Sequence, residues 1–261
     1  MLLSSLYAGG RLDGRWREGT LRPDRAWEVV EGMSPERRER AALFCNLLLL
    51  LAELIVANSA FHSEGLRTLR FYTTDSNLFS GAVSLLYCFF SLRRLNQSGK
   101  GVLARALSGK GGRPGFPGWL LSLRYLASCC LMLTFFVVFF VLAPEKGYLY
   151  EFTEGTKSLS HLIAPLLSLF SLLLFERGGE IPRSMPLLAL LLTLLYGLPI
   201  LALNGIGLVD GPYSFLKIRE QAPGKTLFWF IVILSGNFLI AAGIRRLLSV
   251  EVCHQADSER S

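Results

Sequence analysis

The sequence predicts an all-α, polytopic membrane protein built as a bundle of six transmembrane helices. The 261-residue chain is 51% hydrophobic and has a mean hydropathy of +0.42, which is more apolar surface than a soluble domain of this length normally buries. The apolar residues gather in runs close to the roughly 20 residues that a helix needs to cross about 30 Å of hydrocarbon. The runs show no period-two alternation, so helices with internally bonded backbones are expected and a transmembrane barrel is excluded.

Six apolar runs follow one another along the chain. The first contains a single charged residue, Glu53, and the other five contain no Asp, Glu, Lys or Arg. The expected spans are 41–61, 76–92, 125–144, 158–175, 184–209 and 226–244.

Helix-capping residues and prolines support these spans. Ser34, Pro35 and Glu36 form an N-cap, a first-turn proline and a first-turn acid, so a helix is expected to begin there and to enter the first span. Pro165 and Pro199 lie inside spans and are expected to kink them. The chain is therefore divided into a weakly ordered, charged cytoplasmic extension (1–33), the six-helix domain (34–248) and a cytoplasmic tail (249–261).

The distribution of positive charge predicts the orientation. If the amino terminus is cytoplasmic, the inner segments hold 19 of the 27 Lys and Arg residues. The positive-inside rule then places the protein in the cell membrane with both termini in the cytoplasm. Because the basic residues serve this role, no nucleic-acid partner is expected, and membrane lipids are the expected surroundings.

Isolated charges within the spans have simple interpretations. Glu53 is expected to be protonated and bonded to a neighbouring helix, with a proton-relay role as the alternative. Arg124 is expected to extend to the headgroups. The five cysteines lack metal-ligand spacing, so neither a metal nor another cofactor is predicted.

Two polar stripes enter the bundle from the predicted outer face. Thr74, Asn77, Gly81 and Ser84 share one side of the second span. A similar stripe in the fourth span consists of Ser158, His161, Pro165, Ser168 and Ser171. Both spans start outside, so the two stripes begin at the same depth.

A hydroxyl beside an imidazole suggests nucleophilic chemistry. The imidazole of His161 would take the proton of the Thr74 hydroxyl. Asp75 or Asn77 could orient the ring, while Asn204, Tyr213 or backbone amides could stabilise an oxyanion. The alternative is that these polar groups only join helices by hydrogen bonds.

Three motifs together resemble the androgen-induced membrane protein (FAR-17a/AIG1-like) superfamily, and in particular its bacterial Pr6Pr-type members. They are Tyr72-Thr73-Thr74-Asp75-Ser76-Asn77-Leu78, His161-Leu162-Ile163-Ala164-Pro165 and Gly211-Pro212-Tyr213-Ser214-Phe215.

The resemblance implies a multi-pass hydrolase of lipid-like carboxylic esters. By position, Thr74 matches its nucleophile and His161 its histidine, while Tyr213 and Phe215 match an aromatic pair before the last span. Thr73 directly precedes Thr74, so either could supply the hydroxyl. A non-catalytic protein that binds a lipid or small solute in the same pocket, and a small-solute transporter, remain the alternatives.

Overall fold

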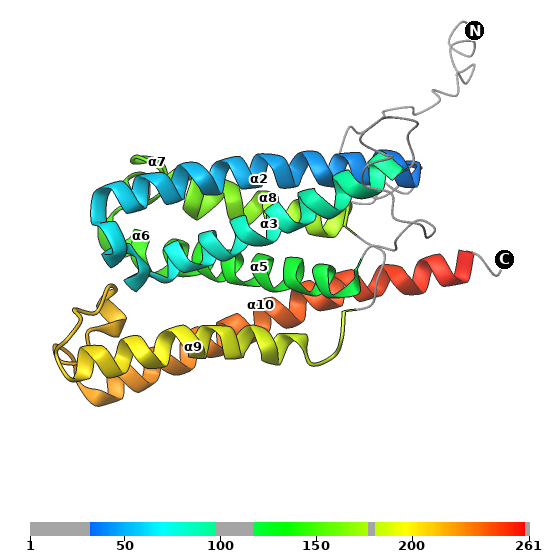
Figure 1. Cartoon of the computed structure of the whole chain (residues 1–261). Coiled ribbons are helices and arrows are strands. Elements are labelled where there is room, and N and C mark those ends of the chain that lie inside the picture. The colour runs from blue at the N-terminus through cyan, green and yellow to red at the C-terminus, as the bar shows by residue number, and fades with distance from the viewer. Residues whose placement is uncertain (1–31, 98–116, 177–180, 259–261) are drawn as a thin grey trace, which may run out of the picture. The chain divides into compact units, whose positions relative to one another are not determined.

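The computed structural model describes residues 32–97, 117–176 and 181–258 (Figure 1). The chain divides into two units, Met1–Met33 and Ser34–Ser261. The expected cytoplasmic extension lies almost entirely outside the described residues, so the fold below is that of the second unit.

Every regular element in the described ranges is helical, and no strand occurs there, so the prediction of an all-α bundle is confirmed. The elements are α2 (Pro35–Glu64), η1 (Gly65–Arg70), α3 (Tyr72–Gln97), α5 (Gly118–Val137), η2 (Val138–Leu142), α6 (Ala143–Lys146), α7 (Tyr148–Thr153), η3 (Leu159–Ile163), α8 (Ala164–Leu174), α9 (Met185–Gly205), η4 (Ser214–Leu216) and α10 (Pro223–Ser258).

Five of these helices are long and apolar enough to cross a membrane, and Leu159–Leu174 forms a sixth, shorter apolar helix among the described residues. All six lie where the apolar runs predicted spans. The expected cap is present, because the Ser34 hydroxyl accepts a hydrogen bond from the Arg37 amide at 3.4 Å. The last helix continues to Ser258, so part of the segment expected as a tail is helical.

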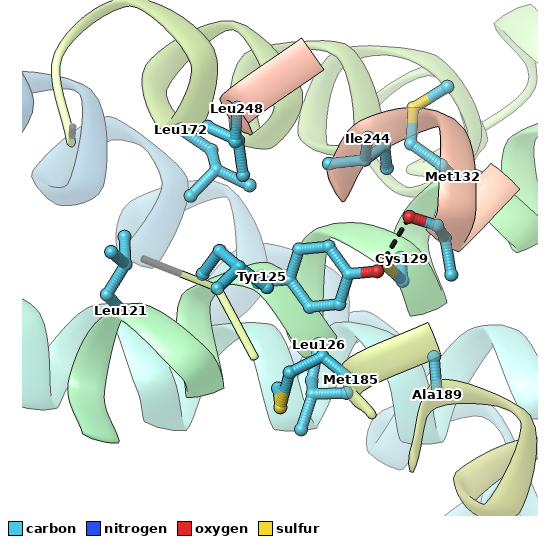
Figure 2. Packing of buried hydrophobic residues seen from close by; sticks show 12 residues of the cluster. Leu121, Tyr125, Leu126, Cys129, Met132, Leu172, Met185, Ala189, Ile244 and Leu248 are labelled. Carbon is cyan, nitrogen blue, oxygen red and sulfur yellow. Dashed lines mark hydrogen bonds between the residues drawn. The ribbon is translucent and has the colours of Figure 1, made fainter. Parts of the chain in front are cut away.

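Helix α5 is the centre of the packing. It contacts α3, α8, α9 and α10, while α2 packs against α3 and α8 (Figure 1). Tyr125 of α5 is fully buried among Leu121, Met132, Ile244 and other apolar side chains (Figure 2). Its hydroxyl donates to the Ala241 carbonyl of α10 at 2.6 Å, which joins the two helices.

At one end of the bundle α3 and α10 begin, and α5 and α9 end, close to η4 (Figure 1). We call this the η4 end. It corresponds to the face that the sequence predicts to lie outside.

Two π-helical turns, η2 and η3, lie at this end, and each is followed within two residues by a proline. Pro144 and Pro165 cannot donate the backbone hydrogen bond of an α-helix and would clash with the carbonyl four residues earlier. A wider π turn relieves this clash. Before Pro165 the helix is therefore locally widened. The widened turn is η3, which carries His161.

The prediction that Arg124 extends to the headgroups is wrong. Its side chain is fully buried and pairs with Glu176, through Nε to Oε2 at 2.7 Å and Nη2 to Oε1 at 2.9 Å. Asn46 and Ser171 also donate to Glu176 Oε1, at 2.8 and 2.6 Å. Burial is tolerated because the carboxylate accepts four hydrogen bonds and the guanidinium forms two of them.

Candidate functional site

A pocket opens among α3, α5, η2, α9 and α10 at the η4 end. Its empty volume is about 720 Å³, a value that includes the space at its mouth. Most of the lining is aliphatic or aromatic, and no lining side chain is charged. The lining residues that carry a polar group have a hydroxyl or, in one case, an indole, and they are Tyr72, Thr73, Thr134, Thr193, Tyr196, Tyr213, Thr226 and Trp229.

Thr73 and Tyr213 form the polar contact between the first turn of α3 and the loop before α10. The Tyr213 hydroxyl accepts from the Thr73 backbone amide and pairs with the Thr73 hydroxyl, both at 3.3 Å. The amides of a first helical turn lack intrahelical partners, so Tyr213 satisfies one of them. Burial raises the pKa of Tyr213, which keeps its hydroxyl neutral.

The aromatic pair expected near the last span is present. Phe215 stacks on Tyr213, with ring centroids 5.2 Å apart and an interplanar angle of 12°. Phe215 also contacts Trp229 of α10, at 5.9 Å between centroids. The loop thereby contributes an aromatic wall that faces the pocket.

The loop that carries this pair depends on Gly211 and Asn204. A Cβ atom at Gly211 would lie 2.6 Å from the Leu216 carbonyl oxygen, so the turn has no room for a side chain. Asn204 donates to the Val209 carbonyl and accepts from the Ile218 amide, each at 2.9 Å. Asn204 therefore holds the loop and does not line the pocket, which differs from its expected role at an oxyanion.

Hydrogen bonds between α3, α9 and α10 lie next to the pocket. Asn237 donates to the Thr193 hydroxyl at 2.6 Å and to the Ala189 carbonyl at 3.1 Å. The Tyr72 hydroxyl pairs with Thr193 at 3.3 Å. These contacts join the helices, as expected of polar groups within a membrane.

Thr74 and His161 lie at the same end of the bundle but neither lines the pocket. The buried Thr74 hydroxyl pairs with that of Thr68 at 3.0 Å. The His161 ring instead bonds the backbone of Glu151. Within the described ranges no hydrogen bond joins Thr74 to His161, although α3 and η3 contact each other.

The surroundings of His161 fix the orientation of its ring. Nδ1 lies 2.8 Å from the Glu151 carbonyl oxygen, which can only accept, so Nδ1 carries the proton. The neutral ring therefore presents Nε2 as its acceptor. The buried Glu151 carboxylate lies 3.6 Å from Nδ1 through its Oε2 atom. Its Oε1 atom lies 3.7 Å from Nζ of Lys157 and 3.9 Å from Nζ of Lys146.

The side chains of the other two expected site residues make no hydrogen bond to Thr74 or His161 within the described ranges. Asp75 is half-buried and makes no side-chain hydrogen bond to a described residue. Asn77 is buried and donates to the Thr73 carbonyl at 2.6 Å. No group of three His, Cys, Asp or Glu side chains with metal-binding geometry occurs within the described ranges.

Sequence reasoning missed several residues that surround His161 or line the pocket. Glu151 gave no periodic signal because it lies in a short helix between spans, ten residues before His161. Thr134 and Thr193 could have been found, since each is an isolated hydroxyl deep in an apolar run. Their convergence with Tyr72 depends on helix neighbours that no local pattern specifies.

No protein-family model matches this chain, and neither a curated protein nor a solved structure is significantly similar to it. The resemblance carried by the three motifs therefore stays a prediction.

Proposed function

We propose that this integral membrane protein binds an uncharged, lipid-like molecule, such as a carboxylic ester, in the pocket at the η4 end. The observation that carries the proposal is the lining, which is almost wholly apolar, includes hydroxyl-bearing residues and contains no charged side chain. Such a lining favours alkyl chains and one neutral hydrogen-bonding group, and it disfavours a free carboxylate or ammonium.

Thr73 and Tyr213 are the proposed contacts for that polar group. Both line the pocket, and their mutual contact at 3.3 Å is long enough to be exchanged for a hydrogen bond to a ligand. Phe215 and Trp229 would cover the adjoining alkyl portion.

Quenching of tryptophan fluorescence by a brominated monoacylglycerol tests this proposal, because Trp229 lines the pocket and Trp119 does not. We expect saturable quenching that disappears in Trp229→Phe and persists in Trp119→Phe. Tyr213→Phe should weaken binding by about threefold to tenfold, the usual effect of one lost hydrogen bond.

Tyr148→Phe is the matched control, since Tyr148 is outside the lining and should leave binding unchanged. Brominated stearate, which is charged, should quench less at equal concentration. Quenching that never saturates, or that is equal in Tyr213→Phe and wild type, would reject the proposed pocket.

A lipid esterase is the second candidate, favoured by the fixed orientation of the His161 ring. In this reaction a threonine oxygen attacks the ester carbonyl while Nε2 of His161 takes the hydroxyl proton, the alcohol leaves, and water then releases the acid. Thr74 is the nucleophile that the resemblance implies. Of the two threonines in the doublet, Thr73 is the one that lines the pocket.

Labelling by a fluorophosphonate probe tests the esterase. We expect it to be lost in His161→Ala and in one of Thr73→Ala and Thr74→Ala, which identifies the nucleophile. Labelling that survives all three substitutions in well-expressed protein would remove the hydrolase and leave the binding function intact.

A further inference from the structure

A second group of polar side chains lies between α2 and α3, and none of its members lines the pocket. Glu53 of α2 is 3% exposed, and Asn77, Ser80 and Ser84 of α3 are 2%, 0% and 0% exposed. The three α3 residues recur at intervals of three and four, so they lie on one side of that helix.

Close approach of the two helices places Glu53 against this side of α3. A Cβ atom at Gly81 would lie 3.1 Å from Glu53 Cβ, so a side chain there would press tightly against Glu53. The Ser80 hydroxyl lies beside the Glu53 carboxyl group.

Five oxygen atoms of this group have no partner among the residues that the structure describes. They are Oε1 and Oε2 of Glu53, Oδ1 of Asn77, Oγ of Ser80 and Oγ of Ser84. Buried polar atoms are rarely left without partners, because each costs about 1–3 kcal/mol. All five are electron-pair donors, which makes a cation a suitable common partner.

Among the residues that the structure describes, no basic side chain pairs with Glu53. The guanidinium of Arg124 is bound elsewhere, to Glu176 through Nε and Nη2 and to Ser168 through Nη1. An unpaired carboxylate at this depth is unfavourable. One bound positive charge would make the group neutral, whereas a divalent ion would leave an excess charge in hydrocarbon.

We propose that Glu53, Asn77, Ser80 and Ser84 bind one monovalent metal cation of the size of Na⁺ between α2 and α3. Carboxylate, amide and hydroxyl oxygens are suitable ligands for a hard cation. The site is separate from the pocket and does not depend on its proposed function.

Binding of ²²Na⁺ to the purified full-length protein in detergent tests the site. We expect saturable binding of about one ion per chain, and a higher unfolding temperature in NaCl than in choline chloride of equal concentration. Glu53→Gln retains the shape of the side chain but removes its charge, so it should weaken ²²Na⁺ binding by about a hundredfold.

Ser80→Ala is a milder second variant that removes one ligand, and it should weaken ²²Na⁺ binding by about threefold to tenfold. Ser128→Ala is the matched control, because Ser128 is equally buried but pairs with Ser168 at 2.7 Å. It should bind ²²Na⁺ as the wild type does.

Three results would overturn the proposal. The first is the absence of saturable ²²Na⁺ binding to the wild type. The second is binding that is unchanged in both Glu53→Gln and Ser80→Ala. The third is stability that responds to pH but not to NaCl, which would show that Glu53 binds only a proton.

Discussion

Arg124 and Glu176 show how this bundle accommodates full charges among apolar helices. The two side chains neutralise each other, and Asn46 and Ser171 supply further donors from α2 and α8. Each charge is tolerated only while its partner is present, because a lone buried charge is far less stable than a pair. The pair therefore fixes the end of α8 against α5 and α2.

Substitution of one partner should destabilise the protein more than substitution of both. We expect Arg124→Met to lower the free energy of unfolding by about 3–5 kcal/mol, since it leaves Glu176 buried without a counter-charge. Arg124→Met combined with Glu176→Gln should restore most of this loss. Chemical unfolding in detergent, followed by circular dichroism, measures both effects.

Arg70→Met provides the comparison, because the side chains of Arg70 and Glu64, which form an ion pair, are both partly exposed. It should change the free energy of unfolding by less than about 1 kcal/mol. A double variant no more stable than Arg124→Met would contradict the pairing argument.

Neighbouring residues in the Thr73-Thr74 doublet have different surroundings. Successive side chains on an α-helix are rotated by about 100°, so two neighbours can have different surroundings. Thr73 points to Tyr213 and the pocket, while Thr74 points to Thr68. The sequence identified the doublet, but the rotation of α3 about its axis depends on its neighbours and could not be predicted from it.

At the scale of elements, the turn before α10 sets the position of two pocket residues. Gly211 permits the close backbone approach that brings Tyr213 and Phe215 back towards α3 and α10. The loop is thus part of the binding surface as well as a connection.

Gly211→Ala should displace this turn and weaken binding of the brominated monoacylglycerol by about tenfold or more, because its Cβ would overlap backbone atoms that cannot rotate away. Gly224→Ala is the matched control, since a Cβ there meets nothing within 4 Å. Equal quenching curves for the two variants would show that the turn does not position the pocket.

Helix existence was predictable from the sequence, whereas helix neighbours were not. Long apolar runs can only be helices in a bilayer, and Ser34 and Pro35 identified the start of the first one. A polar stripe can indicate which side of a helix packs inward, but it does not reveal which other helix packs against that side. This is why a pocket expected between the second and fourth spans lies among α3, α5, α9 and α10.

At the scale of the whole molecule, the alternating helices place η1, α7 and the loop after α9 at the η4 end (Figure 1). Leu66, Leu149 and Leu208 are 79%, 79% and 72% exposed there. Trp119 is exposed at the opposite end.

Cysteines introduced at Leu66, Leu149 and Leu208 should react with a membrane-impermeant maleimide in intact cells, and one at Trp119 should react only after permeabilisation. The positive charge distribution is the reason for this orientation. Cys45, Cys88, Cys129 and Cys130 are buried, so a Cys253→Ser background should give little native labelling. Opposite accessibility of positions 66 and 149 would separate Thr74 from His161 across the bilayer and exclude the esterase.

Helix α10 supplies one side of the pocket with Trp229, Phe230 and Ile233. On the same helix Leu227, Phe228 and Ile231 are 59%, 58% and 55% exposed, and in a bilayer they would contact acyl chains. The partition between pocket and lipid is therefore a single helix thick. A water-insoluble molecule would travel only the width of that helix to enter, and its effective concentration would be set by its abundance in the surrounding leaflet.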